Sequence, residues 1–331
     1  MAAHDEEALR LFEDEGLSYE EIRGRLGLRT TKQVNHALLR ARKKQAVEYE
    51  DKREYTEDDV EEFIRAMIGL QEKQERINTK QTMANIRIND NKPIGVAYWG
   101  DWHIGGVGVD YKLFEEDLRK IRDTEGLYFI GGGDYKENFI TGLHPGAQFE
   151  QIIQPGMQDI AVRHYMEQVN GKALALVRGC HDDFTHRNTN KDLIEALCLV
   201  TNSVNLWHGG EITIKIGDQS YLWRCRHKYK YQSSLNLENA MRRINELQGP
   251  CDVAAEAHLH NGYIMTRNLM GADRIMLRSG TYKLSDEYGE KLAGYKGHHA
   301  VPTVIMFPDE HRMIGELCLD DAITILGGLR R

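Results

Sequence analysis

Side chains that can bind metal ions follow several apolar stretches of this sequence. Asp101 and His103 come after the apolar run 94–100, and Asp134 comes after the run 127–133. Later apolar runs end near a second set of such residues: Cys180, His181, Asp182, His227, His258 and His260. Carboxylates, imidazoles and thiolates are the side chains that bind divalent cations in proteins. The sequence therefore predicts a metal site made from segments that lie far apart in the chain.

The apolar runs have the pattern of buried β-strands, and amphipathic helical patterns such as 111–123 lie between them. In open α/β sheets, ligands bind at the carboxyl ends of the strands, where the loops converge. In the Asp-x-His and His-x-His pairs, residues two apart on an extended segment would point the same way. We therefore expect the metal-binding side chains to meet at one edge of an α/β core.

Five motifs in a fixed order carry a family resemblance. They read GDWHIGG, GGGDYKENF, RGCHDDF, CRHKY and AEAHLHN, and they span residues 94–307 together with their strands. This order is similar to that of the calcineurin-like metallophosphoesterase superfamily, whose signature is Asp-x-His, Gly-Asp, Gly-Asn-His-Asp/Glu, a single His, and Gly-His-x-His. The resemblance implies an α/β four-layer sandwich, in which two mixed sheets are flanked by helices, and a site for two metal ions.

The resemblance also implies a role for each motif residue. The first metal would be bound by Asp101, His103 and His260, the second by His227 and His258, and both by a bridging Asp134. His181 would contact the phosphate or protonate the leaving group, and Asp182 would orient it. Two such cations stabilise an in-line transition state and lower the pKa of a bound water. The implied cofactors are two divalent ions, with Mn as the first candidate and Zn, Fe, Mg or Ni as alternatives.

Two positions depart from the family signature. Cys180 stands where the family has Asn, and Ala257 stands where it has the first Gly of the last motif. A thiolate is a soft, charged ligand, unlike an amide oxygen. Cys180 could ligate the second metal and favour Zn or Fe, or it could point away and leave that place to water. A third interpretation is that the second site is weak and activity is poor.

Residues 1–46 have the pattern of a helix-turn-helix domain. Ser18 and Glu21 form a capping-box pattern before one helix, and a third helix begins near Thr30 or Thr31. The segment from Arg29 to Lys44 holds six Lys or Arg and no Asp or Glu, which suits a recognition helix on DNA. Groove contacts are expected from Arg29, Thr30, Thr31, Lys32, Gln33, Asn35 and His36, and phosphate contacts from Arg40, Arg42, Lys43 and Lys44. The alternative is a solvated helical bundle with a basic tail.

Residues 47–92 are expected to form a helical linker to a catalytic domain at 93–331. Within it, Val60, Phe63, Ile64, Met67 and Gln71 lie on one stripe of a charged helix. This helix could be a spacer, or it could form a homodimer through residues 56–80.

The overall composition limits the classes of partner. The 331-residue chain has a formal charge of −8, so any nucleic-acid affinity must come from local basic patches. Its five cysteines form no Cys-x-x-Cys pair, and we see neither a signal sequence nor a membrane span. We expect an intracellular, cytoplasmic protein of a bacterial or phage-infected cell, with no membrane partner.

The segment WRCRHKYKY, residues 223–231, alternates basic and aromatic side chains beside His227. Such interleaving suits a nucleic-acid backbone with stacked bases, although it also suits a half-exposed strand with a solvated basic face. Candidate substrate contacts are Arg226, Lys228 and Tyr229, with Tyr282 from the segment 278–283.

Together with the helix-turn-helix pattern, this composition favours a metal-dependent phosphodiesterase that acts on DNA, a nuclease of phage-like organisation. Two alternatives remain: a phosphatase or phosphodiesterase of a small nucleotide, or a DNA-binding regulator with a vestigial hydrolase domain.

Overall fold

The computed structural model describes residues 3–46, 56–77, 82–140, 147–285 and 296–331. The chain divides into two compact units, Met1–Asn78 and Thr79–Arg331. None of the described helices is both long enough and apolar enough to cross a membrane.

The first unit begins with three helices, α1 (Ala3–Glu13), α2 (Tyr19–Arg25) and α3 (Thr31–Ala46). They pack around a small core that includes Leu11, Ile22, Val34 and Leu38. The Ser18–Glu21 capping box forms as predicted, with the Glu21 carboxylate accepting from the Ser18 backbone N–H at 2.8 Å. The three predicted helices of the N-terminal region are therefore present.

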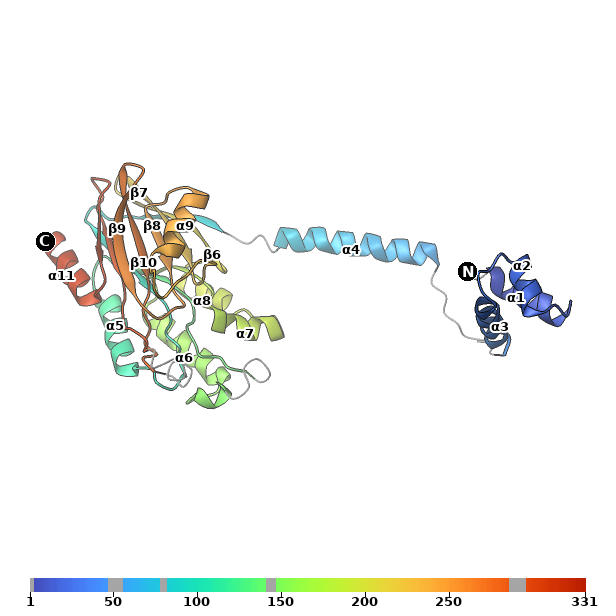
Figure 1. Cartoon of the computed structure of the whole chain (residues 1–331). Coiled ribbons are helices and arrows are strands. Elements are labelled where there is room, and N and C mark those ends of the chain that lie inside the picture. The colour runs from blue at the N-terminus through green and yellow to red at the C-terminus, as the bar shows by residue number, and fades with distance from the viewer. Residues whose placement is uncertain (1–2, 47–55, 78–81, 141–146, 286–295) are drawn as a thin grey trace. The chain divides into compact units, whose positions relative to one another are not determined.

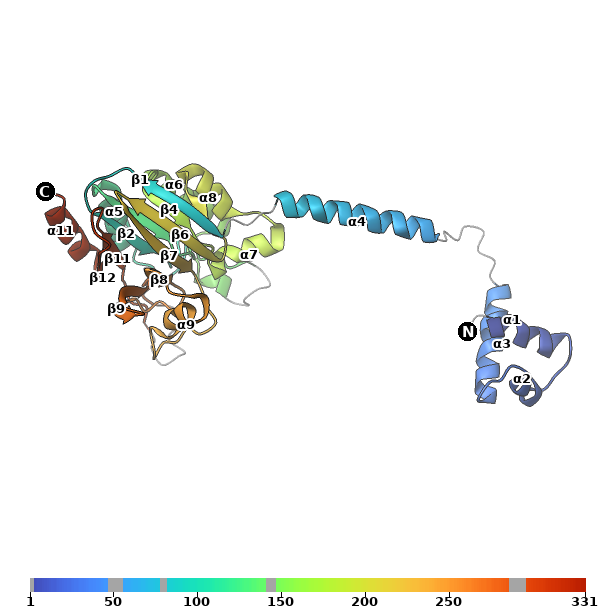
Figure 2. The same ribbon diagram turned by 90° about the horizontal axis from the view of Figure 1, so that it is seen from above.

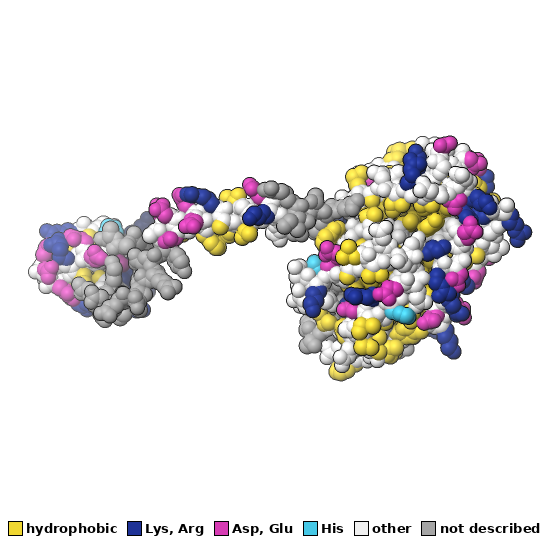
Figure 3. Space-filling model, turned by 180° about the vertical axis from the view of Figure 1, so that it is seen from behind, with side chains coloured by type: hydrophobic (Ala, Val, Ile, Leu, Met, Phe, Trp, Pro, Cys, Tyr) yellow, Lys and Arg dark blue, Asp and Glu magenta, His cyan; other side chains and the backbone are white. Residues whose placement is uncertain are grey.

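Helix α4 (Glu57–Ile77) follows in the same unit. Its predicted apolar stripe is exposed, because Val60, Phe63, Ile64 and Met67 keep 44–64% of their surface in contact with solvent. Figure 3 shows hydrophobic side chains of this helix at the surface.

The second unit contains two six-stranded sheets. The first has the order β1 (Met83–Ile88), β6 (Gly209–Ile216), β7 (Gln219–Arg226), β8 (Val253–Glu256), β10 (Ala272–Arg278) and β9 (Tyr263–Leu269). The second has the order β12 (Met313–Glu316), β11 (Thr303–Met306), β2 (Ile94–Trp99), β3 (Leu127–Gly131), β4 (Ala173–Leu176) and β5 (Val204–Asn205). Both sheets combine parallel and antiparallel pairs.

The sheets pack face to face around one apolar core, to which β2, β4, β6, β7 and β8 all contribute. Helices α5 (Tyr111–Asp123), α6 (Pro155–Gln168), α8 (Leu193–Thr201) and α11 (Leu319–Leu329) lie on the outer side of the second sheet (Figure 1). Helix α9 (Asn239–Gln248) covers the first sheet, as the view from above also shows (Figure 2). The predicted four-layer α/β sandwich is confirmed.

Burial explains why these sequences take these forms. Strand β2 is buried along its whole length, so it reads as a continuous apolar run rather than an alternating one. Helix α5 buries Phe114, Leu118 and Ile121 on one face, and its first turn is capped by Asp110, whose carboxylate accepts from the Leu113 N–H at 3.0 Å.

One part of the predicted helical linker is a strand instead. Residues 83–88 form β1, which pairs in parallel with β6. Ala84 and Ile88 are buried while Asn85 and Arg87 are exposed, and this period of two is the pattern of a strand with one face in the core. Residues 47–55 and 78–81 of the same segment lie outside the described part of the chain.

Candidate metal centre

The predicted ligands come together where five strands of the two sheets end. Asp101 and His103 follow β2, Asp134 follows β3, and Cys180 begins α7 (Cys180–Thr189) after β4, all in one sheet. The other sheet supplies a second set of ligands after β7 and β8: His227, His258 and His260. The backbone N–H of His258 donates to the Asp101 carboxylate at 2.9 Å and so ties the two sheets together at the site. The predicted meeting of these residues at strand ends is therefore what the structure shows.

The ligand atoms form two neighbouring groups, and a third group contains one residue from each of them. In each group they lie within 4.8 Å of one another. These groups are Asp101–His103–His260, Cys180–His227–His258 and Asp101–Asp134–His227, and a fourth, His103–Glu137–His181, adjoins the first. Because the third group contains members of both others, the arrangement has room for two adjacent cations with Asp134 beside them.

The backbone reaches this geometry through left-handed residues rather than extended ones. Asp101, His103, Asp134, His258 and His260 have φ angles between 51° and 80°. The expectation that Asp-x-His and His-x-His converge because they are extended is therefore wrong. Non-glycine residues in this conformation cost free energy and tend to cluster at functional sites, where the surrounding structure must hold them.

In the first group, the ligand atoms of three buried or partly buried side chains face one another. His103 Nδ1 lies 2.8 Å from Glu137 Oε2, so the proton belongs on Nδ1 and Nε2 carries a lone pair. That Nε2 is 3.0 Å from His260 Nε2, and burial lowers the pKa of both imidazoles. Asp101 Oδ1, 3.7 Å from His260 Nε2, is buried and has no hydrogen-bond partner. A cation between these atoms satisfies all of them, so the group fits a metal.

In the second group, His227 is fixed by its backbone contact. Its Nδ1 lies 2.9 Å from the carbonyl oxygen of Gly132, and its Nε2 lies 3.0 Å from Asp134 Oδ2. Burial opposes a charge on His227, but the Asp134 carboxylate outweighs it and raises the pKa of His227 well above its usual value. The site therefore attracts positive charge at the point where a metal would sit.

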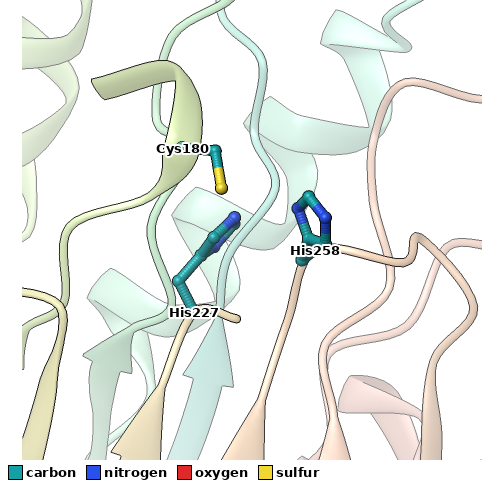
Figure 4. A group of neighbouring side chains, drawn as sticks. All are labelled: Cys180, His227 and His258. Atoms are coloured by element: carbon teal, nitrogen blue, oxygen red, sulfur yellow. The ribbon is translucent and has the colours of Figure 1, made fainter. Parts of the chain in front are cut away.

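His258 completes this group as a neutral ligand, since burial and the neighbouring His227 lower its pKa to about 3. Cys180 is directed at the two imidazoles (Figure 4), and its ligand atom belongs to the same group. The interpretation in which Cys180 points away from the site is not what the structure shows.

The acidic partner predicted for His181 does something else. The Asp182 carboxylate accepts hydrogen bonds from the backbone N–H groups of Asp134, Gly179 and Tyr135, at 2.8, 2.9 and 3.1 Å. It thus positions the loop that carries Asp134, and the role of orienting the His181 imidazole is wrong. That imidazole instead directs Nδ1 at the backbone carbonyl of Glu137.

Two residues of the site were missed from the sequence. Glu137 is fully buried and bridges His103 to Lys283, whose Nζ lies 2.6 Å from Glu137 Oε1. Burial alone would raise the pKa of Glu137, but His103, His181 and Lys283 lower it to about 2. Glu137 lies three residues after Asp134 and Lys283 comes from a distant loop, so only the folded loops reveal the pair.

The candidate substrate contacts differ in their burial: one lies in the core, and the others lie at or near the surface. Tyr282 is buried, accepts from Trp99 Nε1 at 2.8 Å and donates to Asp117 at 2.7 Å, so it belongs to the core and not to a substrate surface. The predicted alternation stops because β7 ends at Arg226. Arg226 stacks over Tyr229, with its guanidinium carbon 5.9 Å from the ring centre, and Lys228 is exposed.

The candidate DNA-binding residues lie at the start and along one side of α3. Most are exposed, including Arg29, Thr30, Lys32, Gln33, His36 and Lys43. Thr31 and Asn35 are partly buried, and the side chain of Lys44 lies outside the described residues. Gln33 caps its own helix by accepting from the backbone of Arg29 and Thr30.

Two of the predicted phosphate contacts already have acidic partners. Arg40 pairs with Asp5, with nitrogen–oxygen distances of 2.8 and 2.9 Å, and Arg42 pairs with Glu13 at 3.2 Å. These exposed pairs join α3 to α1. Binding of DNA by this helix stays a prediction.

No model of a protein family matches this sequence, and no curated protein matches it. Among solved structures, the chain is similar to the calcineurin-like phosphoesterase YfkN from Bacillus subtilis, at 9% sequence identity and a TM-score of 0.36, over 72% of this chain and 96% of that one. A predicted phosphoesterase from Streptococcus pneumoniae has 12% identity and a TM-score of 0.32, over 68% and 98%. Vps29 from Chaetomium thermophilum has 12% identity and a TM-score of 0.35, over 67% and 96%.

Proposed function

We propose that this protein is a dinuclear-metal-dependent phosphoesterase of the calcineurin-like kind, and that it hydrolyses phosphodiester bonds in DNA. The observation that carries the proposal is the pair of ligand groups linked by a third group that contains Asp101 and His227, with the buried Asp101 Oδ1, which has no hydrogen-bond partner, among them. A buried cluster of carboxylates and imidazoles is costly unless cations or protons compensate it.

The residues that would hold the first ion are Asp101, His103 and His260, and those for the second are His227, His258 and Cys180, with Asp134 beside both. Two divalent cations supply a stabilising charge for the phosphoryl oxygens and a means to activate water. Mn is the first candidate, and Zn, Fe, Mg and Ni are the alternatives. Two histidines and a thiolate around the second position favour a softer ion such as Zn or Fe there.

His181 has the position expected of a residue that acts on the ester oxygen. Its ring is 4.7 Å from the His103 ring, measured between centres, so it stands at the edge of the metal centre. Because the Glu137 carbonyl holds Nδ1, Nε2 is the ring atom that can exchange a hydrogen bond or a proton with a phosphate ester.

DNA is favoured as the substrate by the N-terminal helices. An exposed basic helix on a protein whose formal charge is −8 concentrates positive charge in one place. A small nucleotide ester is the second candidate substrate, and a cavity beside Phe139 supports the binding of a nucleotide. A DNA-binding regulator with a vestigial site is the third candidate, and the ligand set argues against it because all of the metal-binding imidazoles are in place.

The test is metal titration of the metal-stripped protein. We expect two ions per chain by mass spectrometry, and metal-dependent turnover of bis-p-nitrophenyl phosphate and of labelled DNA. Asp134→Ala and His258→Ala should lose turnover and at least one ion, while His164→Ala, an exposed histidine on α6, should behave as wild type.

Turnover that survives both ligand substitutions would refute the two-metal assignment. Turnover of the small diester without any cleavage of DNA would support a phosphodiesterase activity and would refute DNA as its substrate. Failure to bind metal in the wild-type protein would favour the regulator.

A further inference from the structure

Two phenylalanine rings stand against the imidazole of His181. The ring centres of Phe139 and Phe184 lie 5.0 and 5.1 Å from that of His181. They lie 6.2 Å from each other, with their planes 25° apart. Both rings are partly exposed, so an aromatic surface continues outward from the residue that would face the ester.

A cavity of about 520 Å³ opens beside Phe139. Its apolar walls come from Phe139, Ile140, Ile152, Ile153 and Pro155, and Gln154 stands among the residues that line it. No charged side chain lines it among the described residues. A site of this composition suits an uncharged ligand with an apolar face and a polar edge.

Hydrogen bonds hold the Phe139 wall of this cavity in place. The Gln151 side chain accepts from the Phe139 N–H and donates to the Phe139 carbonyl, both at 2.9 Å. Gln158, which is buried, donates to Gln151 at 2.8 Å and accepts from the Asn138 N–H at 2.7 Å. The wall is therefore fixed before any ligand arrives, and a ligand pays little to order it.

We propose that this cavity and the Phe139–Phe184 surface bind the heterocyclic base of a nucleotide whose phosphate lies at the metal centre. This inference rests on the proposed phosphoesterase function and names the part of the substrate that gives it specificity. A base has a flat apolar face for stacking on an aromatic ring, which is tolerant of base identity. Its edge offers donors and acceptors that match amide side chains such as the exposed Gln154.

Two diesters with the same leaving group test the proposal. Thymidine 5′-(p-nitrophenyl phosphate) carries a base, and methyl p-nitrophenyl phosphate does not. We expect the wild-type protein to favour the first by about tenfold in kcat/KM, the lower range of what one stacked base supplies. Phe139→Ala, which removes the ring, and Ile153→Trp, which fills the cavity, should each reduce this ratio towards about one.

Phe149→Ala is the matched control, because this ring is 81% exposed and does not line the cavity. Its ratio should equal that of the wild type. Equal kcat/KM for the two diesters in the wild-type protein would overturn the base site while leaving the phosphodiesterase intact.

If the protein turns over neither diester, the proposed phosphodiesterase function is wrong. The binding of thymidine then tests the base site independently of catalysis. Calorimetry with thymidine, which has no phosphate, should show binding that Phe139→Ala and Ile153→Trp both weaken. Absence of thymidine binding in that case would overturn the site.

Discussion

At the scale of single residues, the metal centre depends on contacts that sequence spacing does not reveal. The motif residues Asp101, His103 and Asp134 were predicted because their side-chain types bind metals and their strands end together. Glu137 was not predicted, since a glutamate three residues after Asp134 has no distinguishing pattern. Asp182 was assigned to His181 by its place in the motif, yet it binds three backbone N–H groups instead. Side-chain chemistry could be predicted, but the direction of each side chain could not.

The thiol at position 180 should decide which metal the second site prefers. A thiolate among two histidines favours Zn or Fe, and an amide in its place favours harder ions. We expect Cys180→Asn to weaken Zn binding at the second site by about tenfold or more, while turnover with Mn persists. Competition with a chromogenic chelator measures the first and steady-state kinetics the second.

Cys318→Asn is the control for that comparison, since Cys318 is exposed and lies outside the ligand groups. Identical Zn affinity in the wild-type and Cys180→Asn proteins would show that the thiol is a bystander despite its direction.

Glu137 should act as a positioning residue through His103. Its carboxylate fixes the His103 proton on Nδ1 and neutralises the buried Lys283. Partners of this kind typically contribute 10–100-fold to metal affinity or activity. We expect Glu137→Gln to lose affinity for the first metal by about that factor, because the amide nitrogen would face either Lys283 or His103.

Metal affinity measured by chelator competition separates this role from a merely structural one, with circular dichroism to confirm the fold. Glu310→Gln, at an exposed carboxylate that pairs with Arg312, is the control. A folded Glu137→Gln protein with unchanged metal affinity would contradict the role.

At the scale of elements, the strands and helices that build the site were largely predictable, and the turns between them were not. The predicted helix at 111–123 is α5 itself, and the buried strands are where the apolar runs are. The extended geometry expected for Asp-x-His is wrong, because the types of these residues do not reveal that their backbone is left-handed. Residues 83–88 were included in the helical linker because a charged helical pattern precedes them, but they form β1 and pair with β6.

Gly179 lies so close to the loop of Asp134 that it leaves no room for a side chain. A Cβ at this position would lie 2.1 Å from the backbone nitrogen of Asp134 and from its Oδ1. Gly179→Ala should therefore displace the Asp134 loop, cost about 1–3 kcal/mol of unfolding free energy, as overpacking does, and weaken metal binding. Urea unfolding and metal stoichiometry measure the two effects.

Gly156→Ala, near the start of α6, is the matched control, because a Cβ there meets nothing within 4 Å. If Gly179→Ala kept both the stability and the metal content of this control, the loops would be looser than their contacts indicate.

At the scale of the whole molecule, the two proposed functions belong to different units. The metal centre lies in the second unit, and the basic helix α3 lies in the first. The formal charge of −8 belongs to the chain as a whole, whereas the segment from Arg29 to Lys44, which includes most of α3, holds six Lys or Arg and no Asp or Glu. Attraction to DNA would then be local to the first unit, and its loss should leave hydrolysis of a small diester unaffected. The sequence placed boundaries at 46/47 and 92/93, where charge and apolar periodicity change, whereas the compact units of the structure meet between Asn78 and Thr79.

Helix α4 should set the oligomeric state of the full chain. Val60, Phe63, Met67 and Leu70 follow the spacing of a heptad seam and are 46–65% exposed, and burying such side chains stabilises by about 1.5–3 kcal/mol each. A second copy of α4 offers a seam of the same spacing, so we expect a dimer by light scattering at micromolar concentration. Phe63→Glu with Met67→Glu should give a monomer that still hydrolyses a small diester. Arg65→Glu is the control for added negative charge, since Arg65 lies off the seam and pairs with Glu61, and it should remain dimeric. A monomeric wild-type chain, or a dimer that persists in the double variant, would make α4 a spacer and leave each chain to engage DNA with one copy of α3.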